Sequence, residues 1–189
     1  MITARSLDLH VQQLFDLLER LHLALNKAEI EYRLIGGMAV FLQISARDPD
    51  AARFTRDVDI AVRREDVDRI VKAAEAFGFR YRHVAGVDML VSAENPKARS
   101  AVHLVFAREK VRPQDLLAIP DFSEPTRTVE GFLLAPVADL VRMKLTSFLL
   151  KDKTHLIDMD SVGLITPEIE AGLPEARRER LQQVRAEEP

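Results

Sequence analysis

The sequence predicts an α/β protein in which a sheet-forming core is followed by a C-terminal helical subdomain. Apolar residues recur at helical spacing in the first 27 residues and again after residue 135. Between them lie several short segments in which apolar and polar residues alternate, as in strands. Because the strands come first and most helices last, we expect an α/β core over residues 1–135 and a helical extension over residues 136–189.

Each expected helix is indicated by apolar spacing or by a residue suited to its first or last turn. A leucine stripe predicts the first helix, Gly78 is suited to end the third, and Pro136 and Asp152 are suited to begin later ones. Thr166-Pro167 is a further helix start. The main expected helices cover residues 7–27, 38–44, 67–77, 136–150, 152–162 and 174–185.

The expected strands are short and bounded by turn residues. We expect Asn95-Pro96 to form a turn between two of them. Residues 107–130 contain three prolines and little periodicity, which predicts mainly loop. The strands are expected at residues 32–35, 57–62, 79–83, 87–91, 101–106 and 132–134.

The composition excludes several classes of site. The chain has 189 residues and no cysteine, which rules out disulfides, thiolate metal sites and cysteine nucleophiles. Its net charge is -3, so no overall basic field favours nucleic acid. No apolar run suits a signal peptide or a membrane helix, so we expect a soluble, cytoplasmic protein. The charged run Arg177–Arg180 mixes signs with Glu179 and is expected to be a solvated face.

The pair Asp57 and Asp59 is the first candidate for chemistry. Residues two apart on a strand point to the same side, so the two carboxylates are expected to be neighbours. Close carboxylates repel unless a cation lies between them. Mg²⁺ takes oxygen ligands and commonly binds one or two carboxylates together with substrate phosphates. A second Asp-x-Asp, Asp158–Asp160, shows that the pattern alone is common.

The diglycine Gly36-Gly37 is the second candidate. Residues without side chains let the backbone approach a ligand closely, and the amides at a helix start favour phosphate. A Gly-Gly pair is by itself more often only a turn. Together with the two aspartates it indicates a site that holds phosphate through backbone N–H groups and a metal through carboxylates.

A strand, Gly-Gly and a helix, followed by Arg53-x-Thr55-x-Asp57-x-Asp59 on the next strand, resemble the nucleotidyltransferase superfamily related to DNA polymerase beta. The resemblance is greatest to the minimal bacterial branch that includes the AbiEii abortive-infection toxins. It extends over residues 10–165, through a lysine-bearing helix at Lys144 and a Lys-Asp…Asp segment at 151–158. It implies an α/β (α+β) fold with a mixed sheet flanked by helices.

The resemblance also implies an activity. An acceptor hydroxyl would attack the α-phosphate of a nucleoside triphosphate, assisted by Mg²⁺ or Mn²⁺, and pyrophosphate would leave. The acceptor could be a protein side chain, a transfer RNA end or a small molecule. The matching positions are Asp57 and Asp59 for the metal, and Gly36, Gly37, Arg53, Thr55 and Lys144 for the nucleotide phosphates.

The third acidic position of the superfamily is the main departure. Its best match here is His103, which suits Mn²⁺ or Zn²⁺ better than Mg²⁺. His103 could instead be a general base, or only form a hydrogen bond in the sheet. Asp88 is an alternative third carboxylate.

Two further side chains have competing interpretations. The stem of Lys144 is expected to be partly buried, so its ammonium either touches phosphate or only reaches solvent. His155 is expected to be structural, paired with Asp158 or packed under the sheet. The long interval between Gly37 and Asp57 suggests a lid or substrate rim.

Three functions follow as alternatives. The first is a metal-dependent nucleotidyltransferase. The second is a catalytically impaired module of the same fold that binds a nucleotide or a protein partner, as in toxin–antitoxin systems, and the third is an interaction domain in which the aspartates are structural.

Overall fold

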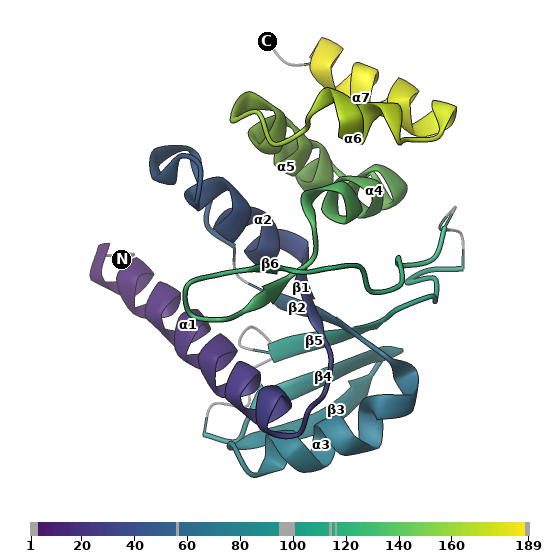
Figure 1. The fold of residues 1–189 in the computed structure, drawn as a ribbon. Helices are drawn as coiled ribbons and strands as arrows, with labels where there is room; N and C mark the ends of the chain where they lie inside the picture. Colours follow the sequence, from purple (N-terminus) through teal and green to yellow (C-terminus); the bar gives the residue numbers. More distant parts are fainter. Residues whose placement is uncertain (1–3, 56, 95–100, 114, 116, 188–189) are drawn as a thin grey trace.

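A computed structural model describes residues 4–55, 57–94, 101–113, 115 and 117–187, with side chains from Val11 onward. The expected α/β fold with a mixed sheet flanked by helices is confirmed (Figure 1). The seven-stranded sheet has the order β3-β4-β5-β2-β1-β7-β6. β2 pairs in parallel with β5 and β1 in parallel with β7, and the other neighbours are antiparallel. The strands are β1 Arg33–Ile35, β2 Val58–Val62, β3 Phe79–Val84, β4 Val87–Ser92, β5 Ala101–Phe106, β6 Thr126–Arg127 and β7 Leu133–Leu134.

The last four helices gather at one end of the molecule with the C-terminus, and α3 lies beside β3, β4 and β5 at the other (Figure 1). α2 contacts β2 and also α4 and α5, and α7 packs against α4 and α5. No helix within the described ranges has the length and apolar character needed to cross a membrane. The helices are α1 Ala4–Lys27, α2 Gly36–Ser45, α3 Val67–Glu75, α4 Val137–Ser147, α5 Leu150–Ser161, α6 Pro167–Ala171 and α7 Glu175–Glu187.

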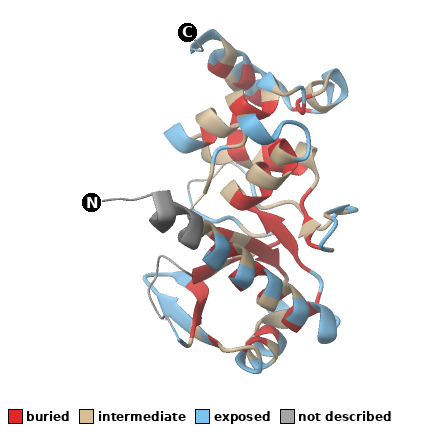
Figure 2. Ribbon diagram, turned by 90° about the vertical axis from the view of Figure 1, so that its left-hand side faces the viewer, coloured by how far each residue is buried: buried red, intermediate tan, exposed pale blue. Residues whose placement is uncertain are grey.

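The leucine stripe of α1 is the clearest confirmed pattern. Its five members are at most 3% exposed, and each such burial contributes about 1.5–3 kcal/mol. Buried residues run along the sheet and the helix faces turned toward it (Figure 2). They form one large cluster that extends from Leu14 to Val184. The core is therefore continuous across residue 135, and a division into two domains there stays a prediction.

Several boundaries differ from the expected ones. α2 begins at Gly36 rather than Met38, and Asp57 precedes β2 instead of lying within it. Asp152 does not cap α5 but occupies its third position, where its Oδ2 accepts the Leu149 N–H at 3.1 Å. This hydrogen bond satisfies a backbone donor that the helix start leaves unpaired, so it replaces the expected cap.

Two loop expectations also need comment. Thr126–Arg127 forms β6 against β7, although the region was expected to be mainly loop, because a two-residue strand has no detectable period. The expected Asn95-Pro96 turn lies outside the described residues.

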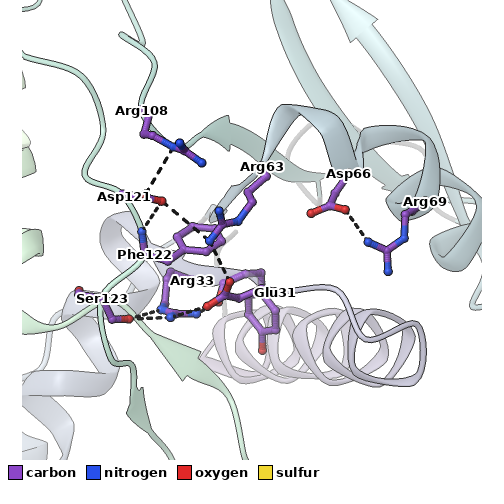
Figure 3. Close-up of polar contacts among 10 residues, drawn as sticks. Glu31, Arg33, Arg63, Asp66, Arg69, Arg108, Asp121, Phe122 and Ser123 are labelled. Carbon is purple, nitrogen blue, oxygen red and sulfur yellow. Dashed lines mark hydrogen bonds and ion pairs between the residues drawn. The ribbon is translucent and has the colours of Figure 1, made fainter.

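Both ends of the segment between β5 and β6 are tied to the rest of the fold. Its base is closed by backbone hydrogen bonds from Arg108 to Ile119 at 2.9 Å and from Ile119 to Glu109 at 2.8 Å. The Phe122 ring lies 4.8 and 4.9 Å from the guanidinium carbons of Arg33 and Arg63 (Figure 3).

Arg33 also donates to the Ser123 carbonyl and to Glu31 (Figure 3). These contacts fasten the segment to β1 and β2, and the part before Phe122 forms one wall of the cavity described below.

Candidate active site

Asp59 and Gly36 meet at the junction of the sheet and α2. Ile35, the last residue of β1, pairs with Asp59 in the antiparallel ladder, so Gly36 follows directly beside that carboxylate. Gly36 has φ +69°, and a Cβ built there would lie 2.1 Å from Asp59 Oδ2. Backbone conformation and contact therefore both require glycine. The expected approach of the diglycine to this aspartate is found.

Gly37 has a second group of neighbours. A Cβ at Gly37 would lie 2.5 Å from Thr55 Oγ1 and 3.5 Å from His155 Cε1. Thr55 comes from the loop before β2 and His155 from α5, so three separate segments meet at the start of α2. The Thr55 hydroxyl and the His155 ring thus lie beside the first turn of α2, whose backbone amides favour an anion.

His103 is the nearest side-chain partner of Asp59. The parallel pairing of β2 and β5 places them side by side, and His103 Nδ1 lies 3.0 Å from Asp59 Oδ1. Both side chains are about one quarter exposed, at 27% and 26%. The hydrogen bond to Asp59 raises the pKa of His103, and the charge of Asp57 acts in the same direction. An imidazolium there partly neutralises the carboxylate.

Asp88 is not a third carboxylate of this site. In the β4–β5 ladder Asp88 opposes Leu104 and Met89 opposes His103, so Asp88 lies on the other face of the sheet. Its Oδ1 accepts hydrogen bonds from Tyr81 and from His83 Nδ1. The alternative assignment of Asp88 is therefore wrong, because neighbouring residues of a strand point to opposite faces.

Lys144 is buried, as expected for its stem, and its ammonium has a partner. Nζ lies 2.7 Å from Asp152 Oδ1, and the two residues are 7% and 2% exposed. Lys144 still lines the cavity, but Asp152 neutralises most of its charge. Lys151 is exposed and also lines the cavity, and no ion pair is found for it within the described ranges.

Arg53 and His155 are arranged differently from the expectation. Asp158 pairs with Arg53, whose Nε lies 2.9 Å from Oδ1, and not with His155. His155 Nδ1 is buried without a hydrogen-bond partner in the described part of the chain. Burial lowers the pKa of His155 to about 4, so the ring is neutral near pH 7. The expected pairing of His155 with Asp158 is wrong because the guanidinium is the stronger partner for the carboxylate.

Of the residues described so far, Gly36, Asp59, Lys144, Lys151 and Asp152 line a cavity of about 520 Å³, whereas Gly37, Arg53, Thr55, His103 and His155 are not part of its lining. Gly36 and Asp59 lie at one part of its lining, and Leu117 to Pro120 form one wall. α4 supplies most of the opposite wall, and Arg177 of α7 completes it. The volume is in the range of small-ligand sites.

Arg177 was expected to be solvated but is only 7% exposed. Its helical spacing to the buried residues Leu181 and Val184 places it on the inner face of α7. That spacing is the signal that could have identified it from the sequence.

The residues suit a divalent cation only when the ligand helps to hold it. Within the described ranges, no group of three or more His, Asp or Glu side chains is arranged to hold a metal. Mg²⁺ commonly binds one or two carboxylates and completes its shell with substrate phosphates. The described residues therefore do not form a metal site made of protein alone, and Asp57 and Asp59 stay the predicted ligands of a metal that would arrive with a nucleotide.

Comparison with known proteins adds the fold. No family model matches the chain, and no curated protein matches it either. A nucleotidyltransferase-like antigenic protein from Paracoccidioides brasiliensis superposes with a TM-score of 0.61 at 20% identity, over 94% of this chain and 89% of the other. ANT(2'')-Ia, solved with adenylyl-2''-tobramycin, has a TM-score of 0.47 at 13% identity, over 90% and 94%. The chain thus has the nucleotidyltransferase-like fold of the first of these structures.

Proposed function

We propose that this chain is a metal-dependent nucleotidyltransferase, which transfers a nucleoside monophosphate from a nucleoside triphosphate to a hydroxyl acceptor. The observation that carries the proposal is the Asp59 carboxylate held against Gly36 at the start of α2, beside a cavity of about 520 Å³. A carboxylate next to helix-start amides repels an anion and so weakens the binding of phosphate alone. When a cation accompanies the phosphate, the same carboxylate attracts the cation and the binding becomes favourable.

The residues divide into two groups in this proposal. The amides that follow Gly36 and Gly37 bind phosphate oxygens, with the Thr55 hydroxyl beside them. Asp57 and Asp59 hold Mg²⁺ or Mn²⁺, which when bound neutralises charge on the phosphates. Arg53, whose side chain is 68% exposed, supplies a positive charge at the rim.

His103 is suited to take the acceptor proton once its bond to Asp59 is released. As long as Asp59 raises the pKa of His103, the ring holds a proton more readily, and a ring that holds a proton cannot take the acceptor's. A cation on Asp59 would remove that effect. The acceptor is a protein side chain, a transfer RNA end or a small molecule. A toxin–antitoxin role of the AbiEii type belongs to the same proposal through the sequence resemblance alone.

A second candidate is a nucleotide-binding or protein-interaction module with impaired catalysis. It is favoured by one observation: His103 stands beside Asp59 where the resemblance predicts a carboxylate. A histidine there weakens Mg²⁺ binding without removing the phosphate-binding amides. This candidate predicts nucleotide affinity without turnover.

Labelled nucleoside triphosphates with Mg²⁺ or Mn²⁺ test the proposal. We expect labelling of the protein or release of pyrophosphate, and loss of both in the variant Asp57→Asn with Asp59→Asn. Asp50→Asn, a change of an exposed carboxylate in the loop before β2, is the matched control and should keep the activity. Circular dichroism verifies that all variants are folded.

The outcomes separate the candidates. Turnover that survives in the double variant contradicts the assignment of the two aspartates. Binding without turnover in the wild type supports the second candidate. If nucleotide with metal does not raise the unfolding temperature at all, both candidates fail, because a ligand at 100 times its dissociation constant stabilises by about 2.7 kcal/mol.

A further inference from the structure

Three arginines gather around the C-terminal half of α4, and within the described ranges Arg177 and Arg180 both lack an anionic partner. Of these two, only Arg177 lines the cavity. Arg180 donates to backbone carbonyls of α4 at 2.6 and 3.2 Å, and Arg142 pairs with Asp139 at 3.2 Å. Arg177 donates only to Thr146 Oγ1, at 2.8 Å. It forms no ion pair with any carboxylate in the described ranges. Most of its guanidinium N–H donors are thus left for another acceptor.

The environment of Arg177 is unfavourable for a cation. The residue is 7% exposed, and buried arginines are normally paired. Burial lowers the pKa of Arg177, and the charges of Arg142 and Arg180 act in the same direction. A buried charge that costs stability and has no partner within the protein suggests that its partner is a ligand.

The carboxylates that line the cavity are already engaged. Asp59 is bonded to His103 and Asp152 to Lys144. Asp115 Oδ2 accepts the backbone N–H of Arg112 at 3.0 Å. Five basic and three acidic side chains line the cavity, whereas the whole chain has a net charge of -3. The cavity lining is therefore more positive than the chain as a whole, and Arg177 belongs to that lining.

The geometry points to a phosphate-binding subsite in this cavity, formed by Arg177 and Arg142. The Thr146 hydroxyl donates to the Arg142 carbonyl at 2.7 Å and accepts from Arg177, so it positions Arg177 and does not bind the phosphate. A guanidinium presents a planar set of donors that matches phosphate oxygens, and low exposure strengthens the interaction. The subsite deepens the proposed function, on which its role in a reaction rests, by assigning a phosphate to one of the reactants. That phosphate belongs either to the tail of the nucleoside triphosphate or to the acceptor.

Titration with inorganic phosphate, without nucleotide or metal, tests the subsite by calorimetry. We expect saturable binding to the wild type and a dissociation constant raised about tenfold or more in Arg177→Met, the usual effect of losing hydrogen bonds to a charged group. Arg178→Met, a change of the exposed neighbour, is the matched control and should bind as the wild type does. Absence of binding to the wild type, or unchanged binding in Arg177→Met, overturns the inference.

Urea unfolding excludes a purely structural role. Because Arg177 has no anionic partner, Arg177→Met should unfold at no lower urea concentration than the wild type in phosphate-free buffer. A clearly lower midpoint, or failure to fold, assigns Arg177 to the fold and overturns the inference.

Two further titrations identify the source of the phosphate and separate this inference from the proposed transfer. If ATP displaces inorganic phosphate, the subsite holds the triphosphate tail, and if both bind together, it holds an acceptor phosphate. Asp57→Asn with Asp59→Asn should keep its affinity for inorganic phosphate. The subsite can therefore be verified even if no nucleotide is transferred. Loss of phosphate binding in that double variant contradicts a subsite separate from the aspartates.

Discussion

Replacing Gly36 by alanine should destabilise the fold through two separable effects. An L-residue at φ +69° costs about 1–2 kcal/mol in backbone strain. The new methyl group would also lie 2.1 Å from Asp59 Oδ2, so the carboxylate has to rotate away. That movement breaks its hydrogen bond to His103, and for a pair about one quarter exposed this costs about 1 kcal/mol. We expect a total loss of about 2–3 kcal/mol.

Gly86→Ala is the matched control. Gly86 has φ +77°, and a Cβ there would meet nothing within 4 Å, so only the backbone cost applies. Urea unfolding followed by circular dichroism should give Gly36→Ala a free energy of unfolding about 1 kcal/mol below that of Gly86→Ala, with equal m-values. In the Asp59→Ala background, Gly36→Ala should cost only about the backbone term, because the carboxylate and its hydrogen bond to His103 are then already absent.

Equal stability of the two alanine variants would refute the reasoning. It would mean that the Asp59 carboxylate is not held against Gly36, and the candidate active site would lose its central contact. A cost of Gly36→Ala in the Asp59→Ala background as large as its cost in the wild type would have the same consequence.

Three more predictions concern the groups around the cavity. Lys144→Met should lower the free energy of unfolding by about 3 kcal/mol in urea titrations, because Asp152 is left buried without its ion-pair partner. Lys151→Met, a change of an exposed lysine, should change this free energy by less than about 0.5 kcal/mol. Equal effects of the two substitutions would contradict a stabilising ion pair. Between pH 6.5 and about 4 the wild type should lose about 1–2 kcal/mol relative to His155→Gln in urea unfolding, after allowance for partial exposure. The folded-state pKa of His155 is lowered to about 4, so as the pH falls the unfolded state takes up the proton first and the free energy of unfolding decreases. If the wild type and His155→Gln show parallel profiles of stability against pH, His155 is not buried in its neutral form. Without metal, His103→Asp should be less stable than the wild type, because a carboxylate replaces the imidazole beside the Asp59 carboxylate. For the same reason it should bind Mn²⁺ about tenfold more tightly in calorimetry. Weaker binding of Mn²⁺ would exclude position 103 from the metal site.

Local patterns in the sequence were sufficient to predict most helices and strands and the contact between Gly36 and Asp59. The leucine stripe of α1 and the two-residue alternation around Asp59 depend only on the geometry of a helix or a strand, so they could be predicted without tertiary contacts. The approach of Gly36 to Asp59 was expected because Gly36 directly follows β1 and Asp59 lies near the start of β2, and these two strands are neighbours. The two-residue strand β6 escaped prediction because it is defined only by its pairing with β7.

The sequence by itself thus determined the α/β class, the leucine-lined core and the Gly-Gly and Asp-x-Asp pair, because these are properties of neighbouring residues. Only the tertiary structure decided which charges meet. It directed Asp88 to the other face of the sheet, gave Lys144 to Asp152, and turned Arg177 inward without an anion. Those outcomes depend on sheet register and on how α7 packs against α4, and both bring together residues far apart in the chain.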